Sequence, residues 1–542
     1  MAKLRGNPWA VLVVLCMGFF MILLDTTIVN IAIPSIIDAL HAGLDQILWV
    51  LNAYILVYAV LLITAGRLGD LYGQRNLFVI GLVIFTIASA ACGFAQSPDQ
   101  LIISRIVQGF GGALLTPQSL AIITTIFPAE KRGAAFGIWG GVAGLASIAG
   151  PTLGGYLVSN TGLSWRAIFF VNVPVGIAVF IAAFALLPST RQGRQHSLDI
   201  VGVILASLGL FGVVFGLIEG QPYSWGAILG PITVYEIIAA GLVVLVGFVI
   251  WERNQREPLI PLALFQNRNF AVMNGVSAAV AFGMLGLFLP FVIYLQSVRG
   301  LTALQAGLTI VPMSLVSLPI APIAGRLTDR IGGKYILMTG LTLFAIGMGM
   351  LALISGLNTQ WYEFLPAFIV AGAGLGMTFA PMTTVAMRNI QPQLAGAASG
   401  VLNTTRQLGG VLGSAVVGAF LQNRLALALH DEAIARSAAL PASFRQSFVD
   451  GFSRAARGGL EVGRGQTGAA SQLPAGLPPA VAQQLAQVSH DVFVNAYLDA
   501  LKPSLVIPVL VMLLGAAACG LIQRRKLAAE EAVRESGQAI TA

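Results

Sequence analysis

Long apolar runs recur along almost the whole of this 542-residue chain. The hydrocarbon core of a bilayer is about 30 Å thick, and about 20 apolar residues of helix are needed to cross it. Backbone polar groups in hydrocarbon must be bonded within the segment, so uniformly apolar runs of this length favour helices over the alternating strands of a barrel. The sequence therefore predicts an all-α polytopic membrane protein with 14 transmembrane helices. The predicted spans are 9–33, 47–65, 77–95, 101–126, 135–157, 167–187, 201–219, 229–250, 271–295, 304–324, 336–355, 364–386, 400–421 and 505–523.

The scarcity and placement of charged residues support this prediction. The chain has 30 Lys and Arg and 22 Asp and Glu, or 10% of its residues, against roughly a quarter in a soluble domain, which excludes a soluble enzyme. Nineteen of the basic residues fall on one side of the predicted bundle, whereas the short loops on the other side hold only Arg166 and Arg299. Basic residues in short loops mark the cytoplasmic side. We therefore expect a multi-pass protein of the cell membrane with both termini in the cytoplasm, and no nucleic-acid partner.

An internal repeat relates two parts of the chain at an offset of 259 residues. The loop Gly66–Gly73 (GRLGDLYG) is echoed by Gly325–Gly332 (GRLTDRIG), and glycines of the fifth span fall on glycines of the thirteenth at the same offset. Transporters are often built from such repeats, with the substrate site between the halves near mid-membrane. The repeat predicts two six-helix halves with two inserted central helices. The predicted domains are residues 1–190, the insertion 191–269 and residues 270–542.

One long segment, 422–503, separates the thirteenth and fourteenth spans and is expected on the outer side. It is rich in Ala, Gly and Gln, and apolar residues recur at helical spacing between Pro479 and Leu501. This spacing predicts an amphipathic helix that leads into the last span. We expect this helix to lie on the outer surface; a lid or a docking surface for a partner protein is the alternative.

Five ionisable side chains fall inside the predicted spans: Asp25, Arg105, Glu219, Glu236 and Arg406. Such charges cost on the order of a few kcal/mol and usually pair with one another or line water. Desolvation favours a neutral carboxyl at Asp25 and a nearby guanidinium favours its charged form, so a modest change in geometry can switch its protonation. We hypothesise that Asp25 accepts the proton and Arg105 tunes its affinity; the alternative is a static ion pair. Glu219 and Glu236 suit snorkelling or helix-end roles, whereas Arg406 could meet anionic groups or backbone carbonyls.

The repeated loop has the composition of a cytoplasmic gate. Its glycines permit tight turns, an aspartate can cap an adjacent helix N-terminus, and Arg67 or Arg75 can pair across the gate. An ordinary tight loop is the alternative, but the echo at 259 residues favours the gate. The gate candidates are Gly66, Arg67, Asp70, Gly73 and Arg75, with Asp329 and Arg330 in the second copy.

A glycine-rich stretch of the fifth span, 150–155, predicts close helix packing and a hinge. Small residues admit close approach, and a proline removes a backbone donor and bends the helix. Packing alone explains the small residues, whereas the Gly-Pro pair suggests a rocking hinge and a seal against proton leak. The hinge candidates are Gly150, Pro151, Gly154 and Gly155.

Three motifs of the chain resemble the signatures of the major facilitator superfamily: the loop 66–76, the run 105–113 (RIVQGFGGA) and the run 150–155 (GPTLGG), which is typical of its exporters. The run 24–34 (LDTTIVNIAIP), the residues around 165–174 and the number of spans resemble the branch of drug:proton antiporters with fourteen helices. The resemblance implies alternating access, with the loop 66–73 as a latch that stabilises the outward-facing state. The first copy departs from the pattern, because Leu71 and Gln74 stand where the family carries basic residues.

Together these patterns predict a proton-coupled secondary exporter that moves amphipathic drugs or toxic compounds out of a bacterial cell. The alternative is a dedicated exporter of one endogenous metabolite, lipid or antibiotic. Its expected partners are amphipathic small molecules, protons and the lipid bilayer. No enzyme activity, metal or cofactor is expected, since the four histidines are scattered and no phosphate loop is present. The candidate substrate residues are Asn30, Trp49 and Gln108.

Overall fold

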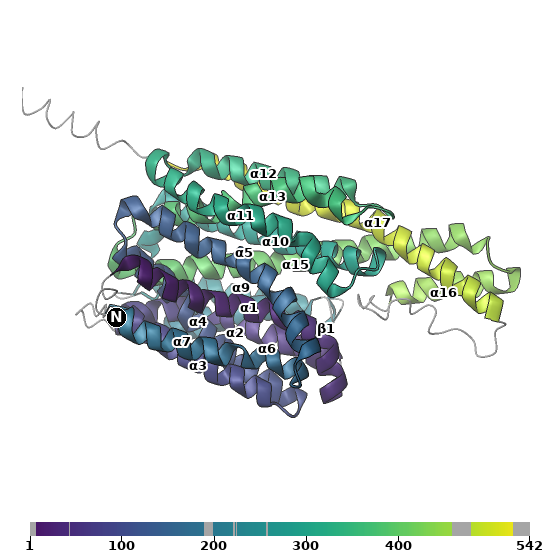
Figure 1. Ribbon diagram of the computed structural model, residues 1–542, viewed down its shortest axis with the longest axis horizontal. Helices are drawn as coiled ribbons and strands as arrows, with labels where there is room; N and C mark the ends of the chain where they lie inside the picture. Colours follow the sequence, from purple (N-terminus) through teal and green to yellow (C-terminus); the bar gives the residue numbers. More distant parts are fainter. Residues whose placement is uncertain are drawn as a thin grey trace, which may run out of the picture.

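The computed structural model describes residues 7–42, 44–188, 199–220, 223, 225–255, 258–457 and 479–523. Helices run side by side as one bundle (Figure 1). The longer helices are α1 (Pro8–Leu40), α2 (Leu44–Tyr72), α3 (Gln74–Phe94), α4 (Pro98–Ile126), α5 (Ala129–Asn160), α7 (Asn172–Leu186), α8 (Ile200–Glu219), α9 (Val234–Arg253), α10 (Arg268–Ile293), α11 (Ala303–Ile331), α12 (Lys334–Ile354), α13 (Leu365–Gly376), α14 (Phe379–Met387), α15 (Ala395–Ser437), α16 (Ala442–Arg457) and α17 (Pro479–Ala518). The short elements are α6 (Ala167–Phe170), the antiparallel strands β1 (Ala227–Leu229) and β2 (Ile232–Thr233), 3₁₀ turns at Ser164–Arg166, Leu262–Gln266, Trp361–Phe364, Pro392–Leu394 and Cys519–Leu521, and a π-helical turn at Tyr294–Val298.

The all-α polytopic fold with fourteen transmembrane helices is confirmed. Thirteen helical segments among the described residues are long and apolar enough to cross a membrane. The remaining predicted span lies in α5, which has 32 residues. At a rise of about 1.5 Å per residue such a helix is roughly 48 Å long, so it exceeds the thickness of the hydrocarbon core.

Two predicted spans differ from the structure in detail. The twelfth span is interrupted between α13 and α14, where the Thr378 hydroxyl donates to the carbonyl of Gly374 at 2.8 Å. The eighth span begins later than predicted, because residues 227–233 form the β hairpin instead of helix. Thr233 and Glu236 then cap α9 reciprocally, each side chain accepting from the other's backbone N–H, which fixes the start of the helix.

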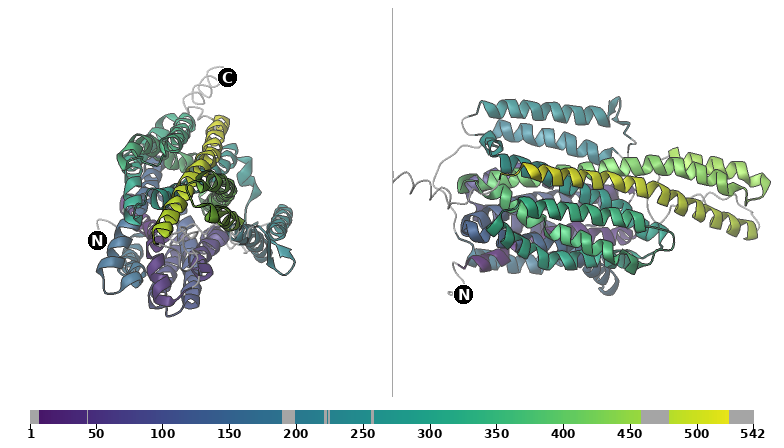
Figure 2. Two further views of the ribbon diagram at one scale, coloured as in Figure 1. Left: turned by 90° about the vertical axis from the view of Figure 1, so that its right-hand side faces the viewer. Right: turned by 90° about the horizontal axis from the view of Figure 1, so that it is seen from above.

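The inserted helices α8 and α9 pack against each other, and α8 also packs against α2 (Figure 2, right). Asp199 caps α8 by accepting from Gly202 N at 2.9 Å, and its carboxylate also accepts from Trp251 Nε1 at 3.0 Å. The bond from Trp251 joins the end of α9 to the start of α8. Two other interfaces link distant parts of the chain, since α5 packs against α11 and α2 packs against α15.

The described parts of the segment 422–503, residues 422–457 and 479–503, do not lie along the outer surface of the bundle as we expected. α15 has 43 residues, roughly twice the length that a bilayer requires, and continues without a break beyond the thirteenth predicted span. The helix expected to begin at Pro479 is continuous with the last span, as α17, and packs against α15. The two helices project together from one end of the bundle, and α16 lies beside α15 within the projection (Figures 1 and 2).

Candidate proton-coupling and gate sites

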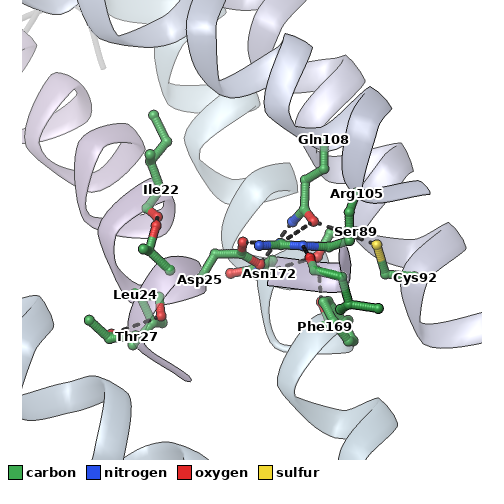
Figure 3. A network of polar contacts seen from close by, with 12 residues as sticks. Ile22, Leu24, Asp25, Thr27, Ser89, Cys92, Arg105, Gln108, Phe169 and Asn172 are labelled. Carbon is green, nitrogen blue, oxygen red and sulfur yellow. Dashed lines mark hydrogen bonds and ion pairs between the residues drawn. The ribbon is translucent and has the colours of Figure 1, made fainter. Parts of the chain in front are cut away.

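Asp25 and Arg105, predicted to act together, form a buried ion pair between α1 and α4 (Figure 3). Their exposed fractions are 0% and 1%. Gln108 Nε2 donates to Asp25 Oδ1 at 2.9 Å, and Asn172 Nδ2 on α7 donates to the same oxygen at 3.3 Å. The Asp25 carboxylate therefore receives donors from α4 and α7 as well as the guanidinium, which compensates much of its desolvation.

The Arg105 guanidinium has partners other than Asp25. Its Nη1 donates to Gln108 Oε1 at 2.7 Å, and its Nε donates to the carbonyl of Val50 on α2 at 3.1 Å. Its Cζ also lies 4.2 Å from the ring centroid of Tyr54, a cation–π geometry. If Asp25 were protonated, Arg105 would still have two neutral acceptors and an aromatic face. The site can thus hold Asp25 in either protonation state without leaving a buried cation unpartnered.

Two further polar residues of the site were missed by reasoning from the sequence. Asn172 Nδ2 also donates to Ser89 Oγ at 3.1 Å, and Ser89 donates to the carbonyl of Phe169 at 2.9 Å. Asn172 and Ser89 are 1% and 0% exposed. Neither carries a charge, and neither is among the neutral residues predicted for the substrate site, Asn30, Trp49 and Gln108. A polar residue inside an apolar run was the signal that could have identified both.

Asp70 of the first loop meets the N-terminus of α15. Its two carboxylate oxygens accept from Gly396 N at 2.9 Å and from Ala397 N at 2.8 Å. A carboxylate at a helix N-terminus satisfies backbone donors that have no partner within the helix and complements the helix dipole. Asp70 therefore joins α2 to α15, two helices that the predicted domains place in different halves.

Asp329 makes the corresponding contact from the second copy of the loop. Its Oδ1 accepts from Gly133 N, near the start of α5, at 3.1 Å. The helices approach closely at both places: a Cβ on Gly66 would lie 2.3 Å from the Gly396 carbonyl oxygen, and one on Gly325 would lie 2.0 Å from that of Gly133. The two loops thus make equivalent contacts, each between helices from different predicted halves.

The last glycine of each loop copy has a left-handed backbone. Gly73 has a φ of 95° and Gly332 has a φ of 89°. Residues with a Cβ rarely adopt such backbone angles. The predicted tight turn therefore occurs at both copies, between α2 and α3 and between α11 and α12.

The three arginines predicted at the gate have different surroundings. The pairing of Arg75 across the gate is wrong for this conformation, because Arg75 donates to the carbonyl of Phe184 on α7 at 2.8 Å, within the N-terminal half. Arg67 is buried, and its charge acts on the carboxylates of Asp70 and Glu252. Arg330 is exposed.

Glu252, near the end of α9, was also missed because the eighth span was predicted to end at residue 250. It is 2% exposed and accepts from Leu259 N at 3.1 Å and Ile260 N at 3.2 Å. Arg67 is a residue of the gate helix α2, and its charge acts on this carboxylate of the inserted helix α9. For Glu236, the expected helix-end role is realised in the cap of α9, and Glu219 is the buried last residue of α8.

The predicted hinge motif lies where α5 passes α1. A Cβ on Gly150 would lie 2.1 Å from Thr27 Oγ1, so this glycine allows the two helices to touch. Thr27, which follows Asp25 by two residues on α1, also donates to the carbonyl of Ala146 on α5 at 3.3 Å. Gly154 and Gly155 continue the same helix beyond Pro151, whose side chain lies outside the described part of the structure. The motif is therefore next to the coupling site.

Of the three candidate substrate residues, Gln108 and Trp49 lie in different surroundings. Gln108 is fully buried and is bonded within the Asp25 site, so it belongs there. Trp49 lies 5.9 Å, centroid to centroid, from Phe215 of the inserted helix α8. The side chain of Asn30 lies outside the described part of the structure.

A bundle of membrane-spanning helices with a buried ion pair, and with two similar loops that each bind a helix distant in the sequence, is typical of membrane transporters. The profile described as Major Facilitator Superfamily matches residues 15–414. An uncharacterised MFS-type transporter of Mycobacterium tuberculosis is 44% identical over 78% of this chain and 71% of its own. The tetracenomycin C resistance and export protein of Streptomyces glaucescens is 36% identical over 78% of this chain and 77% of its own.

The crystal structure of the human organic anion transporter MFSD10 has the same fold, with a TM-score of 0.55. The two chains are 14% identical, and the match covers 76% of this chain and 93% of the other. The chain belongs to the major facilitator superfamily. It is therefore a multi-pass membrane protein of a family of small-molecule transporters.

Proposed function

We propose that this protein is a drug:proton antiporter, which exports amphipathic compounds across the bacterial cell membrane by alternating access. In the proposed cycle, Asp25 takes up a proton from outside and releases it to the cytoplasm. A substrate moves outward in the other half of the cycle. Both termini face the cytoplasm in this proposal, in agreement with the distribution of basic residues.

The observation that carries the proposal is the mixed set of partners around Arg105. Arg105 has neutral acceptors in Gln108 and Val50 that remain when Asp25 is protonated, so loss of the Asp25 charge does not leave the guanidinium without hydrogen-bond partners. Asp25 is 0% exposed, so in this conformation the proton site is closed to both sides. Exchange of the proton therefore requires the movement that alternating access provides.

The contacts of Asp70 and Asp329 support the same mechanism. Both lie at the end of the bundle where the predicted cytoplasmic loops gather, and both carboxylates bind backbone N–H groups across the interface. These bonds hold this side closed, and they must break for the bundle to open toward the cytoplasm. The hinge motif beside Asp25 can transmit such a movement to the proton site.

The alternative function is the dedicated export of one endogenous metabolite, lipid or antibiotic. It is favoured by the relative from Streptomyces glaucescens, whose name specifies a single compound. The proton cycle is the same in both cases. A panel of structurally unrelated drugs, tested against a strain that lacks the gene, distinguishes them, since a dedicated exporter protects against one compound class only.

The test of proton coupling is Asp25→Asn in proteoliposomes. We expect this variant to lose substrate-driven proton release, because an amide cannot carry the proton, and to retain exchange of labelled substrate across the membrane. Asp38→Asn is the matched control, since Asp38 lies on the same helix but is exposed. Normal proton release from the Asp25→Asn protein would refute the assignment.

A further inference from the structure

Arg406 is a second arginine inside the bundle, and the proposed proton cycle does not use it. It lies eleven residues into α15, which begins at Ala395, or roughly 17 Å from that end of the helix. This depth is about half of a 30 Å hydrocarbon core. Its side chain is half-buried.

No carboxylate in the described ranges of the chain forms an ion pair with Arg406. The ionisable group that acts on its charge is Tyr58 of α2, whose hydroxyl is within hydrogen-bonding reach. Arg105, in contrast, has Asp25 as a partner. Since no carboxylate of the described residues offsets the Arg406 charge, this guanidinium retains most of the cost of a charge at mid-membrane.

The surroundings of Arg406 connect it to the proton site. The Tyr58 hydroxyl donates to Thr116 Oγ1 on α4 at 3.0 Å. Tyr58 stacks on Tyr54, with ring centroids 6.0 Å apart and planes 8° from parallel, and Tyr54 in turn lies against Arg105. A continuous series of contacts thus runs from Asp25 through α4 and α2 to Arg406 on α15.

We propose that Arg406 binds the oxyanion of amphipathic substrates that carry a carboxylate or a comparable acidic group. Such a group would neutralise the uncompensated guanidinium and form charge-assisted hydrogen bonds with it, as Arg does wherever planar oxyanions are recognised. Arg406 is thus a specificity-determining residue that prefers anionic over neutral or cationic compounds.

This inference deepens the proposed export function, because it names the substrate class of the same transporter. It also explains how substrate and proton can communicate. Loading of an anion at Arg406 changes the charge at one end of the Tyr58–Tyr54 stack, and Arg105 contacts the other end. The two sites lie on helices from different predicted halves, so both respond when those halves move.

The test compares binding of two matched probes to the purified full-length protein in detergent. 9-Anthracenecarboxylate and 9-anthracenemethanol share one ring system and differ in charge, and both report binding by fluorescence. We expect the wild-type protein to bind the carboxylate roughly tenfold more tightly than the alcohol or better. Arg406→Gln should remove this preference and leave the affinity for the alcohol unchanged, and Arg406→Lys should retain part of the preference.

Arg424→Gln is the matched control, since Arg424 lies on the same helix but is exposed. Equal affinity of the wild-type protein for the two probes would overturn the proposal, whether or not the Arg406→Gln protein folds. Equal weakening of both probes in Arg406→Gln would also overturn it, because a structural role predicts that result. Binding needs no proton gradient, so failure of substrate-driven proton release would refute antiport alone and leave the anion preference standing.

Discussion

Arg105 contacts a carboxylate, an amide oxygen, a backbone carbonyl and an aromatic ring at the same time. Only a planar guanidinium with donors in several directions can do this, since a lysine ammonium is a compact point charge. We predict that Arg105→Lys lowers substrate-driven proton release by roughly tenfold or more, in line with the loss of one or two buried charged hydrogen bonds. The measurement is proton release from proteoliposomes when substrate is added.

Arg424→Lys is the control for this prediction, because Arg424 is exposed and its guanidinium lies 5.7 Å from the ring of Phe420 only. It should release protons at the wild-type rate. If Arg105→Lys matches that rate, a positive charge alone suffices at this position, and the planar guanidinium with its several donors has no role in coupling.

The residues of the coupling site were predictable to different degrees. Asp25 and Arg105 could be identified because a charge inside an apolar run is expensive and therefore rare. Ser89 and Asn172 carry no charge, and nothing local indicates that α3 and α7 bring them to Asp25. Glu252 was missed for another reason, since an error of two residues in a span boundary placed a buried carboxylate outside the membrane.

At the scale of helices, the crossing of α2 and α15 depends on glycine at both contact points. A methyl group on Gly66 would lie 2.3 Å from the Gly396 carbonyl oxygen, and this obstacle is backbone and cannot rotate away. We predict that Gly66→Ala separates the two helices and lowers the free energy of unfolding by roughly 1–3 kcal/mol, the usual cost of overpacking. The unfolding midpoint of the purified protein should fall, together with its transport rate.

Gly275→Ala is the matched control, since nothing lies within 4 Å of a Cβ at that position in α10. The same substitution there should leave the unfolding midpoint and the transport rate near those of the wild type. A Gly66→Ala protein as stable as this control would show that α2 and α15 can separate without cost.

The interruptions of helices were the part of the fold that the sequence did not predict. Hydropathy reports only that a segment is apolar, and it is the same for one long helix and for α13 followed by α14. The hairpin of β1 and β2 was hidden because its residues are as apolar as the span that follows. The projection of α15 and α17 was predicted in part. The helix expected from the amphipathic spacing at Pro479 is present as the first part of α17, but it continues the last span and does not lie on the outer surface.

At the scale of the whole molecule, the repeat at 259 residues predicted which loops would behave alike but not what they would touch. Each copy binds backbone N–H groups near the start of a helix distant in the sequence: Asp70 contacts α15 and Asp329 contacts α5. Spacing within the sequence contains no information about such contacts, because they depend on how the helices pack. The division of the chain into two six-helix halves stays a prediction that experiments on these loops can address.

Both loop carboxylates bind backbone N–H groups of a helix distant in the sequence, and this predicts that neutralising either carboxylate favours opening. Asp70 accepts from Gly396 N at 2.9 Å and from Ala397 N at 2.8 Å, and Asp329 accepts from Gly133 N at 3.1 Å. An asparagine loses the charge that faces the helix dipole. Asp70→Asn and Asp329→Asn should therefore each favour the state open to the cytoplasm by roughly tenfold, or about 1.4 kcal/mol.

A cysteine at Ser399 reports this opening, because Ser399 is 0% exposed one turn beyond Gly396 and the native Cys16, Cys92 and Cys519 are all buried. Labelling of Ser399→Cys by a hydrophilic maleimide should be faster with Asp70→Asn or with Asp329→Asn than in the parent protein, and fastest with both. Asp38→Asn should leave labelling unchanged, since Asp38 is exposed near the other end of α1. If neither gate variant labels faster than the parent protein, these carboxylates do not hold the cytoplasmic side closed, and the gate must depend on helix packing alone.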